Sequence, residues 1–275
     1  MSAGFIPSHL EVVAAGAHPT KVALVAHGIM GSASNWRGFF RKLVEDPRAA
    51  AYRWVLVDLR HHGRSDGTPP GPDTVRSCAE DLIALTRHLG VTPTVTVGHS
   101  FGGKVVLAHG ELAPVTPERV LVLDSSLGVE RPAEPGSTGD DVFRVIEGLR
   151  SLPSPIPSRE ALVEALTGQG FSLMLARWMT TNLEGTTGEG YRFRFDLDGI
   201  GRLIGDYFTL DAWPLIERLG ARIHVVRGDR SDRIPEVDVA RLDALGVPVT
   251  TLSAGHWVHV DAPDALRDVI AGALS

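Results

Sequence analysis

The stretch Gly98-His99-Ser100-Phe101-Gly102 is the most informative part of this sequence. It follows the apolar run Val95-Thr96-Val97 and opens a helix-like run from Phe101 to Leu112. A serine among glycines at a turn from strand to helix is typical of a nucleophile elbow. There the glycines let the chain bend sharply enough to raise the serine hydroxyl above a sheet. Ser100 is therefore the candidate nucleophile, and an ordinary glycine-rich turn is the alternative interpretation.

Apolar segments and helix-like segments alternate on both sides of this turn. The apolar segments are rich in Val, Leu and Ile without strict alternation, as expected of parallel strands that are covered on both faces. The expected strands are Leu10–Ala14, Val22–Ala26, Trp54–Asp58, Thr94–Gly98, Val120–Asp124, Ile223–Arg227 and Val249–Leu252. The expected helices are Trp36–Val44, Val75–Leu89, Gly103–Leu112, Val237–Leu245 and Ala265–Ala273. This alternation predicts an α/β fold with a mostly parallel, doubly wound sheet.

The alternation breaks in the segment 127–213, which is rich in Pro and Gly near its start. Short helices are expected within it at Arg159–Leu166 and Phe171–Thr180. We interpret this segment as a mainly helical insertion that caps the carboxyl edge of the sheet, where open α/β sheets bind their ligands. Residues 1–126 and 214–275 would then form the core.

The composition of the chain restricts the partners and the cellular compartments that we expect. The chain has 275 residues, a hydrophobic fraction of 43% and a formal net charge of −6. This charge, without a run of Lys or Arg, argues against nucleic acid as a partner. Cys78 is the one cysteine, so no intrachain disulfide can form. Neither a signal peptide nor a stretch of about twenty apolar residues is recognisable. We therefore expect a soluble cytoplasmic protein, whose oligomeric state the sequence leaves open.

A serine nucleophile needs a base, and His256 is the best placed of the histidines. It follows the last expected strand and precedes the last expected helix, in Ala254-Gly255-His256-Trp257. An imidazole can take the serine proton and return it to the leaving group. His259 raises the possibility of a metal pair, but the spacing lacks a zincin signature and acidic companions, so no metal is expected. His99 is interpreted as structural, and His61, His62 and His88 as surface or loop histidines.

An acyl-transfer site also needs two backbone N–H groups that stabilise the developing oxyanion. Phe101, directly after the nucleophile, is expected to supply one of them. The second is expected from the loop His27-Gly28-Ile29-Met30-Gly31-Ser32, which follows the strand Val22–Ala26. Ile29 is the first choice for this donor. Met30 is the second choice and is also expected to line the acyl site.

Four segments together resemble the α/β-hydrolase family. They are His27 to Ser32, Asp58 to Ser65, Gly98 to Gly103, and Gly255 to His259, in the family's order and approximate spacing. Asn182-Leu183 and the run from Tyr191 to Leu197 resemble the small esterase branch, which includes bacterial acyl-ester and acyl-thioester hydrolases. The resemblance implies a cofactor-free serine hydrolase that works through an acyl-enzyme.

The acid of the triad has more than one candidate. The usual family position, three residues after the glycine of the seventh strand, falls on Ser231 when counted from Gly228. Asp232 lies one residue later and Asp229 two residues earlier. The branch that this chain resembles can instead take its acid from the strand that ends at Asp124. Asp124 and Asp232 are therefore both carried as candidates, with Asp229 as a third.

Substrate preference is inferred from apolar side chains. Aromatic and Met residues gather in the expected cap, and Trp178 there, with Met30 and Trp257 from the core, is expected to contact substrate. Such a site favours a small to medium apolar acyl group in an ester, with thioesters possible. The same triad could instead cleave a C–C bond or act as a cofactor-free perhydrolase or haloperoxidase. A non-catalytic, ligand-binding member of the fold is the alternative of a different class.

Overall fold

The computed structural model describes residues 5–65, 67, 69–129, 138–186 and 188–274. Seven strands form one sheet in the order β1-β3-β2-β4-β5-β8-β9. Their bounds are β1 His9–Val12, β2 Lys21–Ala26, β3 Tyr52–Val57, β4 Val95–His99, β5 Arg119–Leu123, β8 Ile223–Gly228 and β9 Val249–Leu252. β1 pairs antiparallel with β3, and the other neighbours are parallel. The predicted fold class is confirmed, and each strand lies within about two residues of its predicted bounds.

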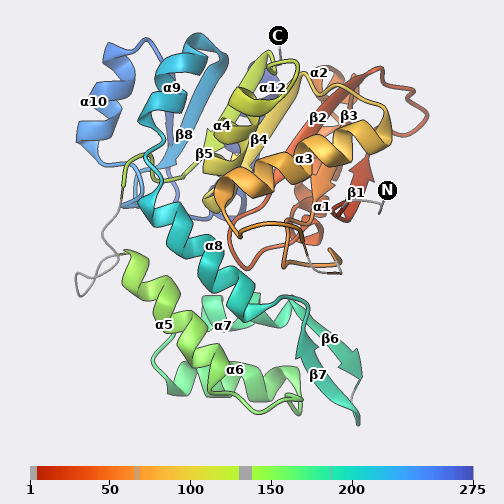
Figure 1. The fold of residues 1–275 in the computed structure, drawn as a ribbon, viewed down its shortest axis with the longest axis vertical. Helices are drawn as coiled ribbons and strands as arrows, with labels where there is room; N and C mark the ends of the chain where they lie inside the picture. Colours follow the sequence, from red (N-terminus) through yellow and green to blue (C-terminus); the bar gives the residue numbers. More distant parts are fainter. Residues whose placement is uncertain (1–4, 66, 68, 130–137, 187, 275) are drawn as a thin grey trace.

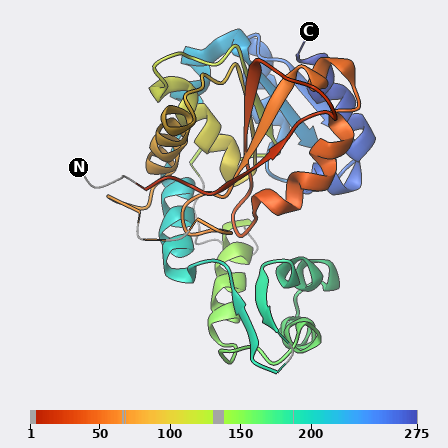
Figure 2. The same cartoon turned by 90° about the vertical axis from the view of Figure 1, so that its right-hand side faces the viewer.

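Helices cover both faces of the sheet (Figures 1 and 2). One face carries α3 and α4, and the other carries α1 and α12. The bounds of the helices around the sheet are α1 Ala33–Leu43, α2 Pro47–Ala50, α3 Val75–Leu89, α4 Phe101–Leu112, α9 Trp213–Leu219, α10 Glu236–Ala244, α11 Val258–Asp261 and α12 Pro263–Gly272, with a 3₁₀ turn at Gly220–Arg222. The strands are buried from both sides because their Val and Leu side chains pack into two separate apolar clusters.

Most of the polypeptide between β5 and α9 forms a lobe at one end of the sheet, called the insertion below (Figure 1). Its helices are α5 Thr138–Arg150, α6 Arg159–Gly168, α7 Leu173–Thr180 and α8 Leu197–Thr209, and its hairpin is β6 Leu183–Thr186 with β7 Gly190–Phe193. Helices α6 and α7 were predicted from the sequence, whereas α5, α8 and the hairpin were not. Helix α8 contains three glycines, which lower intrinsic helix propensity and obscure the helical pattern.

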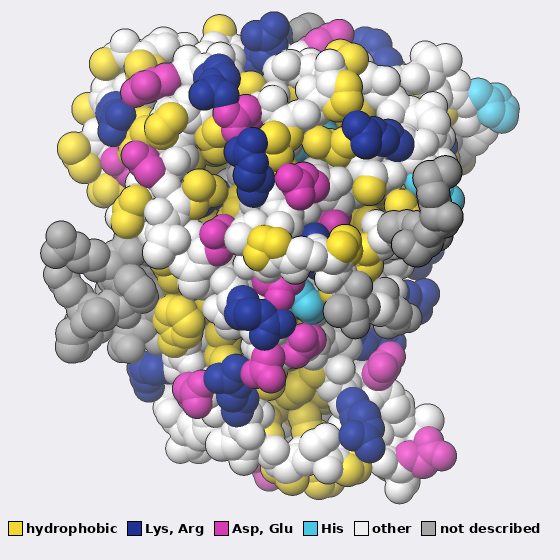
Figure 3. Space-filling model, in the orientation of Figure 1, with side chains coloured by type: hydrophobic (Ala, Val, Ile, Leu, Met, Phe, Trp, Pro, Cys, Tyr) yellow, Lys and Arg dark blue, Asp and Glu magenta, His cyan; other side chains and the backbone are white. Residues whose placement is uncertain are grey.

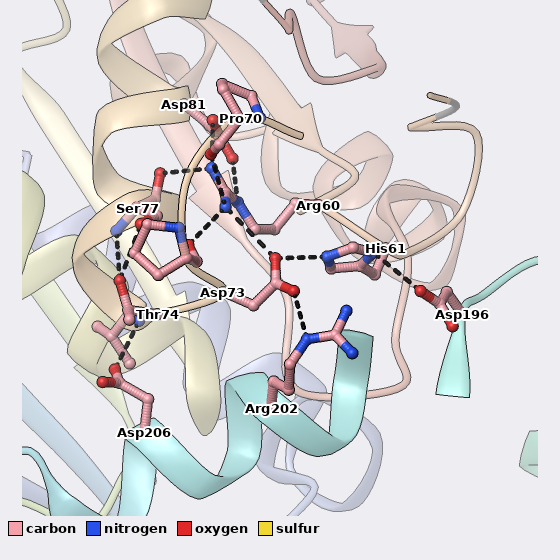
Figure 4. A network of polar contacts seen from close by, with 12 residues as sticks. Arg60, His61, Pro70, Asp73, Thr74, Ser77, Asp81, Asp196, Arg202 and Asp206 are labelled. Carbon is pink, nitrogen blue, oxygen red and sulfur yellow. Dashed lines mark hydrogen bonds and ion pairs between the residues drawn. The ribbon is translucent and has the colours of Figure 1, made fainter. Parts of the chain in front are cut away.

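Polar contacts fix α8 to the core (Figure 4). Arg202 of α8 donates a hydrogen bond to Asp73, which also binds the ring of His61 at 2.6 Å. Four residues further along α8, the Asp206 carboxylate accepts the backbone N–H of Val75 at the start of α3. These contacts hold one side of the insertion against the loops that lead into α3.

Lys104 fixes both ends of the insertion. It lies in α4, one turn after Ser100, and its side chain is fully buried. Its Nζ donates to the carbonyl oxygens of Gly128, Tyr207 and Leu210, at 2.7–2.9 Å. Gly128 follows β5, while Tyr207 and Leu210 lie at the end of α8, so one buried ammonium joins the two points where the chain enters and leaves the insertion.

Charges of both signs are interspersed on the face of the molecule seen in Figure 3. That face presents no continuous field of one sign. Among the described residues, no helix is long and apolar enough to cross a bilayer.

Candidate active site

Ser100 lies at the sharp turn between β4 and α4. Its backbone has φ 52° and ψ −120°, a conformation that costs a non-glycine residue about 1–3 kcal/mol. Neighbouring glycines allow the turn: a Cβ on Gly98 would collide with the carbonyl of Gly102, and a Cβ on Gly102 would collide with the carbonyl of Ala26. The turn is also held by the Ser100 N–H, which donates to Leu123 O at 2.9 Å. The strained serine is therefore built into the packing of strand against helix.

Three side chains form a connected chain of hydrogen bonds. Ser100 Oγ lies 3.0 Å from His256 Nε2, and His256 Nδ1 lies 2.7 Å from Asp124 Oδ2. The carboxylate can only accept, so Nδ1 carries the proton and Nε2 is free to accept from the serine hydroxyl. The structure thus brings Ser100, His256 and Asp124 together.

Asp124 is fully buried just after β5 and has a positive φ of 45°. Its Oδ1 accepts the Gly228 N–H at 2.9 Å, and its Oδ2 also accepts the Ser231 hydroxyl at 2.5 Å. A buried carboxylate needs such donors because it has left water. Ser231 is the position that the usual family spacing assigns to an acid, and here its hydroxyl supports an acid that comes from the neighbouring strand.

The other two acid candidates lie elsewhere. Asp232 has a side chain that is 71% exposed, and Asp229 accepts the N–H of Ala254. Both ring nitrogens of His256 are already engaged by Ser100 and Asp124. Neither Asp232 nor Asp229 therefore takes the hydrogen bond of the imidazole, although the charge of Asp232 acts on its pKa.

The surroundings of His256 change the pKa of its imidazole. Burial lowers the pKa of its imidazole below the usual 6.5, and the positive charge of Arg233 lowers it further, while the hydrogen bond to Asp124 acts in the opposite direction. His99 fixes the loop behind it, because its Nε2–H donates to the carbonyl oxygen of His256 at 2.9 Å. Burial also holds the pKa of His99 well below its ordinary value, so this ring is neutral. Burial and the charge of Arg233 thus favour the neutral form of His256, the form that can accept a proton.

The loop from His27 to Ser32 lies beside Ser100. Met30 has a positive φ of 57°, and its N–H donates to His62 Nε2 at 3.0 Å. Met30 therefore cannot donate to an oxyanion, which corrects its place as second choice. The N–H of Gly31 is also engaged, by Gly28 O. Ile29 remains the candidate donor of this loop, together with Phe101 at the first position of α4.

Two buried histidines, His27 and His62, hold this loop, and neither role was predicted from the sequence. His62 Nδ1–H donates to Arg60 O, while His27 donates to Gly28 O and accepts the Leu59 N–H. Burial lowers the pKa of His27 to about 4 and that of His62 to about 3, so both rings are neutral. His62 lies in a loop, as one of the two predicted alternatives had it, but it is not a surface histidine, because it is 1% exposed.

The insertion also reaches this loop. Asn182, which lies between α7 and β6 and is 3% exposed, donates from Nδ2 to the carbonyl oxygen of Met30 at 2.8 Å. The backbone of Met30 is thus bound on two sides. Its N–H donates to His62 of the core, and its carbonyl oxygen accepts from Asn182 of the insertion. The position of the insertion and the geometry of the loop that carries Ile29 are therefore coupled.

A cavity of about 360 Å³ opens onto Ser100 and His256. Met30, Trp178 and Trp257, the three predicted substrate contacts, all line it, and the two indole rings lie 5.4 Å apart. Its other apolar walls come from the insertion, through Val142, Val145, Met174, Leu175, Ile204 and Tyr207, and from the core, through Ile29, Trp36 and Val260. Among the described residues, no group of three or more His, Cys, Asp or Glu side chains is arranged to hold a metal ion.

A strained serine, a histidine and a buried aspartate at the edge of a mostly parallel sheet define the class of α/β hydrolases. The model of the alpha/beta hydrolase family matches residues 23–269, and the chain belongs to this family. It is 26% identical over 261 residues to mouse sn-1-specific diacylglycerol lipase ABHD11, covering 90% of this chain and 79% of that protein. It is 25% identical over 263 residues to Escherichia coli esterase YbfF, covering 92% of each chain.

Solved structures agree with this assignment of the fold. A marine microorganism esterase superposes with a TM-score of 0.81 at 21% identity, covering 98% of this chain and 99% of that one. The predicted family, fold class and enzyme class are confirmed: the chain is an enzyme of the hydrolase class.

Proposed function

We propose that this enzyme hydrolyses carboxylic esters through a triad of Ser100, His256 and Asp124. The observation that carries the proposal is the continuous chain of hydrogen bonds from the Ser100 hydroxyl through His256 to the buried Asp124 carboxylate. Water and a bound ester are the only reactants that this arrangement requires, so no cofactor is invoked.

In the first half-reaction, Ser100 Oγ attacks the acyl carbon while His256 Nε2 takes its proton. The carbonyl oxygen becomes an oxyanion, which the N–H groups of Ile29 and Phe101 stabilise. The C–O bond to the alcohol breaks, and His256 delivers the proton to the leaving alkoxide. Asp124 keeps the imidazole in the required tautomer and stabilises the imidazolium.

In the second half-reaction, a water molecule attacks the acyl-enzyme. His256 takes a proton from this water, the bond to Ser100 Oγ breaks, and the proton returns to the serine. The products are the carboxylic acid and the regenerated enzyme. Thioesters follow the same steps with a thiolate leaving group.

The cavity supports small to medium apolar acyl groups, because its volume of about 360 Å³ lies near the lower end of the range for small-molecule sites. The insertion, residues 127–213, supplies most of its apolar wall, and we infer that it acts as the cap of a core made of residues 1–126 and 214–275. Trp178 from the insertion and Trp257 beside His256 would shield the acyl-enzyme from bulk solvent.

A p-nitrophenyl ester series from C2 to C16 tests the proposal. Wild type should hydrolyse the shorter members, and Ser100→Ala should be inactive and should fail to react with a fluorophosphonate label. Asp124→Asn should lose most activity, whereas the matched variant Asp232→Asn should retain it. If wild type were as inert toward the esters as Ser100→Ala, the ester proposal would be lost. Labelling of Ser100 would then favour C–C hydrolysis or perhydrolysis by the same triad, and absence of labelling would favour a binding role.

A further inference from the structure

The candidate active site contains a cation that the triad does not use. Arg233 lies on the loop after β8, two residues beyond Ser231, whose hydroxyl binds Asp124. Its side chain is 11% exposed and lines the same cavity as Ser100 and His256. A guanidinium is charged at every pH at which this enzyme would be assayed. A permanent positive charge thus lies in a cavity whose other walls are largely apolar.

This guanidinium is poorly paired within the protein. Among the described residues, its buried Nε has no hydrogen-bond partner. Its ion pair there, with Asp232, spans 3.8 Å from Nε to Oδ1, and the Asp232 side chain is 71% exposed. An ion pair of that length to a carboxylate in water compensates little of the cost of burying a cation.

Arg60, a buried arginine whose side chain is 2% exposed, is fully paired in contrast. Its Nε and Nη2 bind the two oxygens of Asp81 at 2.7 and 2.9 Å, and its Nη1 donates to Pro72 O at 2.9 Å. Each edge of the Arg60 guanidinium therefore has an acceptor (Figure 4). Within the described part of the chain, the Arg233 Nε has no such acceptor and the side chain lines the substrate cavity, so we expect the missing acceptor to arrive with the substrate.

Electrostatic effects place the Arg233 charge close to the reacting groups. Its positive charge contributes to lowering the pKa of both His256 and His99. Arg233 and Ser100 also line the same cavity of about 360 Å³, so a small molecule in this cavity could contact the guanidinium and the Ser100 hydroxyl together.

We propose that Arg233 binds a carboxylate carried by the substrate, so that the preferred substrates are esters with one free carboxylate. This inference rests on the ester hydrolysis proposed above. A planar monoanion fits because a guanidinium edge binds a carboxylate through two parallel hydrogen bonds. One positive charge in an apolar cavity balances one negative charge, whereas a phosphate dianion would leave an excess charge buried.

The carboxylate can be carried by the acyl group or by the leaving group, and two pairs of esters distinguish these sources. The acyl pair is mono-p-nitrophenyl glutarate and its methyl ester. The leaving-group pair is 4-butyryloxybenzoate and its methyl ester. For each pair, the measured quantity is the ratio of kcat/KM for the charged ester to kcat/KM for the neutral one.

Wild type, Arg233→Gln and the control Arg230→Gln are compared at about pH 8.5, where His256 is neutral in all three. Arg230 is an exposed arginine of the same loop that bonds to Asp229 and Ser253. Because a charged hydrogen-bonded contact contributes about 10- to 100-fold to affinity, Arg233→Gln should lower the ratio by that factor in one pair, mainly through KM. Arg230→Gln should leave it unchanged. Circular dichroism confirms that the variants are folded.

A second measurement does not depend on turnover. Glutarate should bind wild type at least 10-fold more tightly than Arg233→Gln in isothermal titration calorimetry. If both ratios and glutarate binding are unaffected by Arg233→Gln while neutral esters are still hydrolysed, the carboxylate site is refuted and ester hydrolysis stands. If wild type hydrolyses none of the four esters and Ser100 resists a fluorophosphonate, the proposed ester function itself has failed.

Discussion

Replacing His62 by Phe tests how the loop that carries Ile29 is held. In the folded protein His62 accepts the Met30 N–H and donates to Arg60 O. Phe fills a similar volume but can do neither, so two buried backbone groups lose their partners. Each such loss costs about 1–3 kcal/mol, and we expect the free energy of unfolding to fall by about 2–5 kcal/mol at about pH 7.5. The kcat for esters should also fall, by about 10-fold or more, because the Ile29 N–H is no longer held in place.

The same substitution has a distinct pH signature. Burial lowers the pKa of His62 to about 3, against 6.5 in the unfolded chain. Between these values the unfolded chain binds a proton that the folded protein does not, so stability present above pH 6.5 is lost as the pH falls. At 1.36 kcal/mol per pH unit, His62 accounts for a loss of about 2 kcal/mol between about pH 7.5 and about pH 5. His62→Phe lacks this loss, so its deficit relative to wild type should shrink by about 2 kcal/mol.

Urea unfolding at the two pH values measures both effects. His88→Phe is the matched control, because His88 is exposed on α3, and it should change stability at the higher pH by less than about 0.5 kcal/mol. A stability gap between wild type and His62→Phe that stays constant with pH would show that His62 is not held neutral by the fold, and the reasoning about this loop would be wrong.

Three further outcomes are expected. Since the pKa of His256 is lowered from 6.5 and its neutral form is the base, kcat/KM should rise with pH and reach half its maximum below pH 6.5 in a pH–rate profile. Lys104→Met strips the buried ammonium from three carbonyl oxygens and should lower the free energy of unfolding by about 3 kcal/mol or more, measured by urea titration. Asp124→Asn should lower kcat by about 10³- to 10⁴-fold, and adding Ser231→Asp should restore part of it, because the Ser231 side chain already reaches Asp124 Oδ2. A double variant as slow as Asp124→Asn alone in the ester assay would count against that geometry.

The architecture of the core was predictable from sequence because its determinants are local. Buried parallel strands produce unbroken apolar runs, and α3 was predicted at its observed bounds, Val75–Leu89. The insertion was less predictable. Helix α8 carries Gly199 where a Cβ would collide with the ring of His61, so close packing against the core, and not helix propensity, decides its sequence.

The side chains that support the site escaped prediction for a different reason. His62 stands in the polar run Arg60-His61-His62-Gly63, which indicates an exposed loop. It is buried because each ring nitrogen meets a backbone group, Met30 N–H on one side and Arg60 O on the other. Such pairing depends on the path of two loops about thirty residues apart, and no periodicity in the sequence reports it.

The spacing of residues in the sequence does not by itself identify Asp124 as the partner of His256. Counting three residues from Gly228 leads to Ser231, which is not an acid. The parallel strands β5 and β8 are neighbours in the sheet, so residues that follow either strand lie near the same imidazole. A carboxylate after either strand could therefore reach His256 Nδ1. Asp124 does so with a positive φ, and Ser231 contributes a hydroxyl to the same carboxylate. A triad requires a carboxylate within hydrogen-bond distance of the imidazole Nδ1. A residue after β5 or a residue after β8 can meet this requirement, and only the three-dimensional arrangement shows which of the two does so.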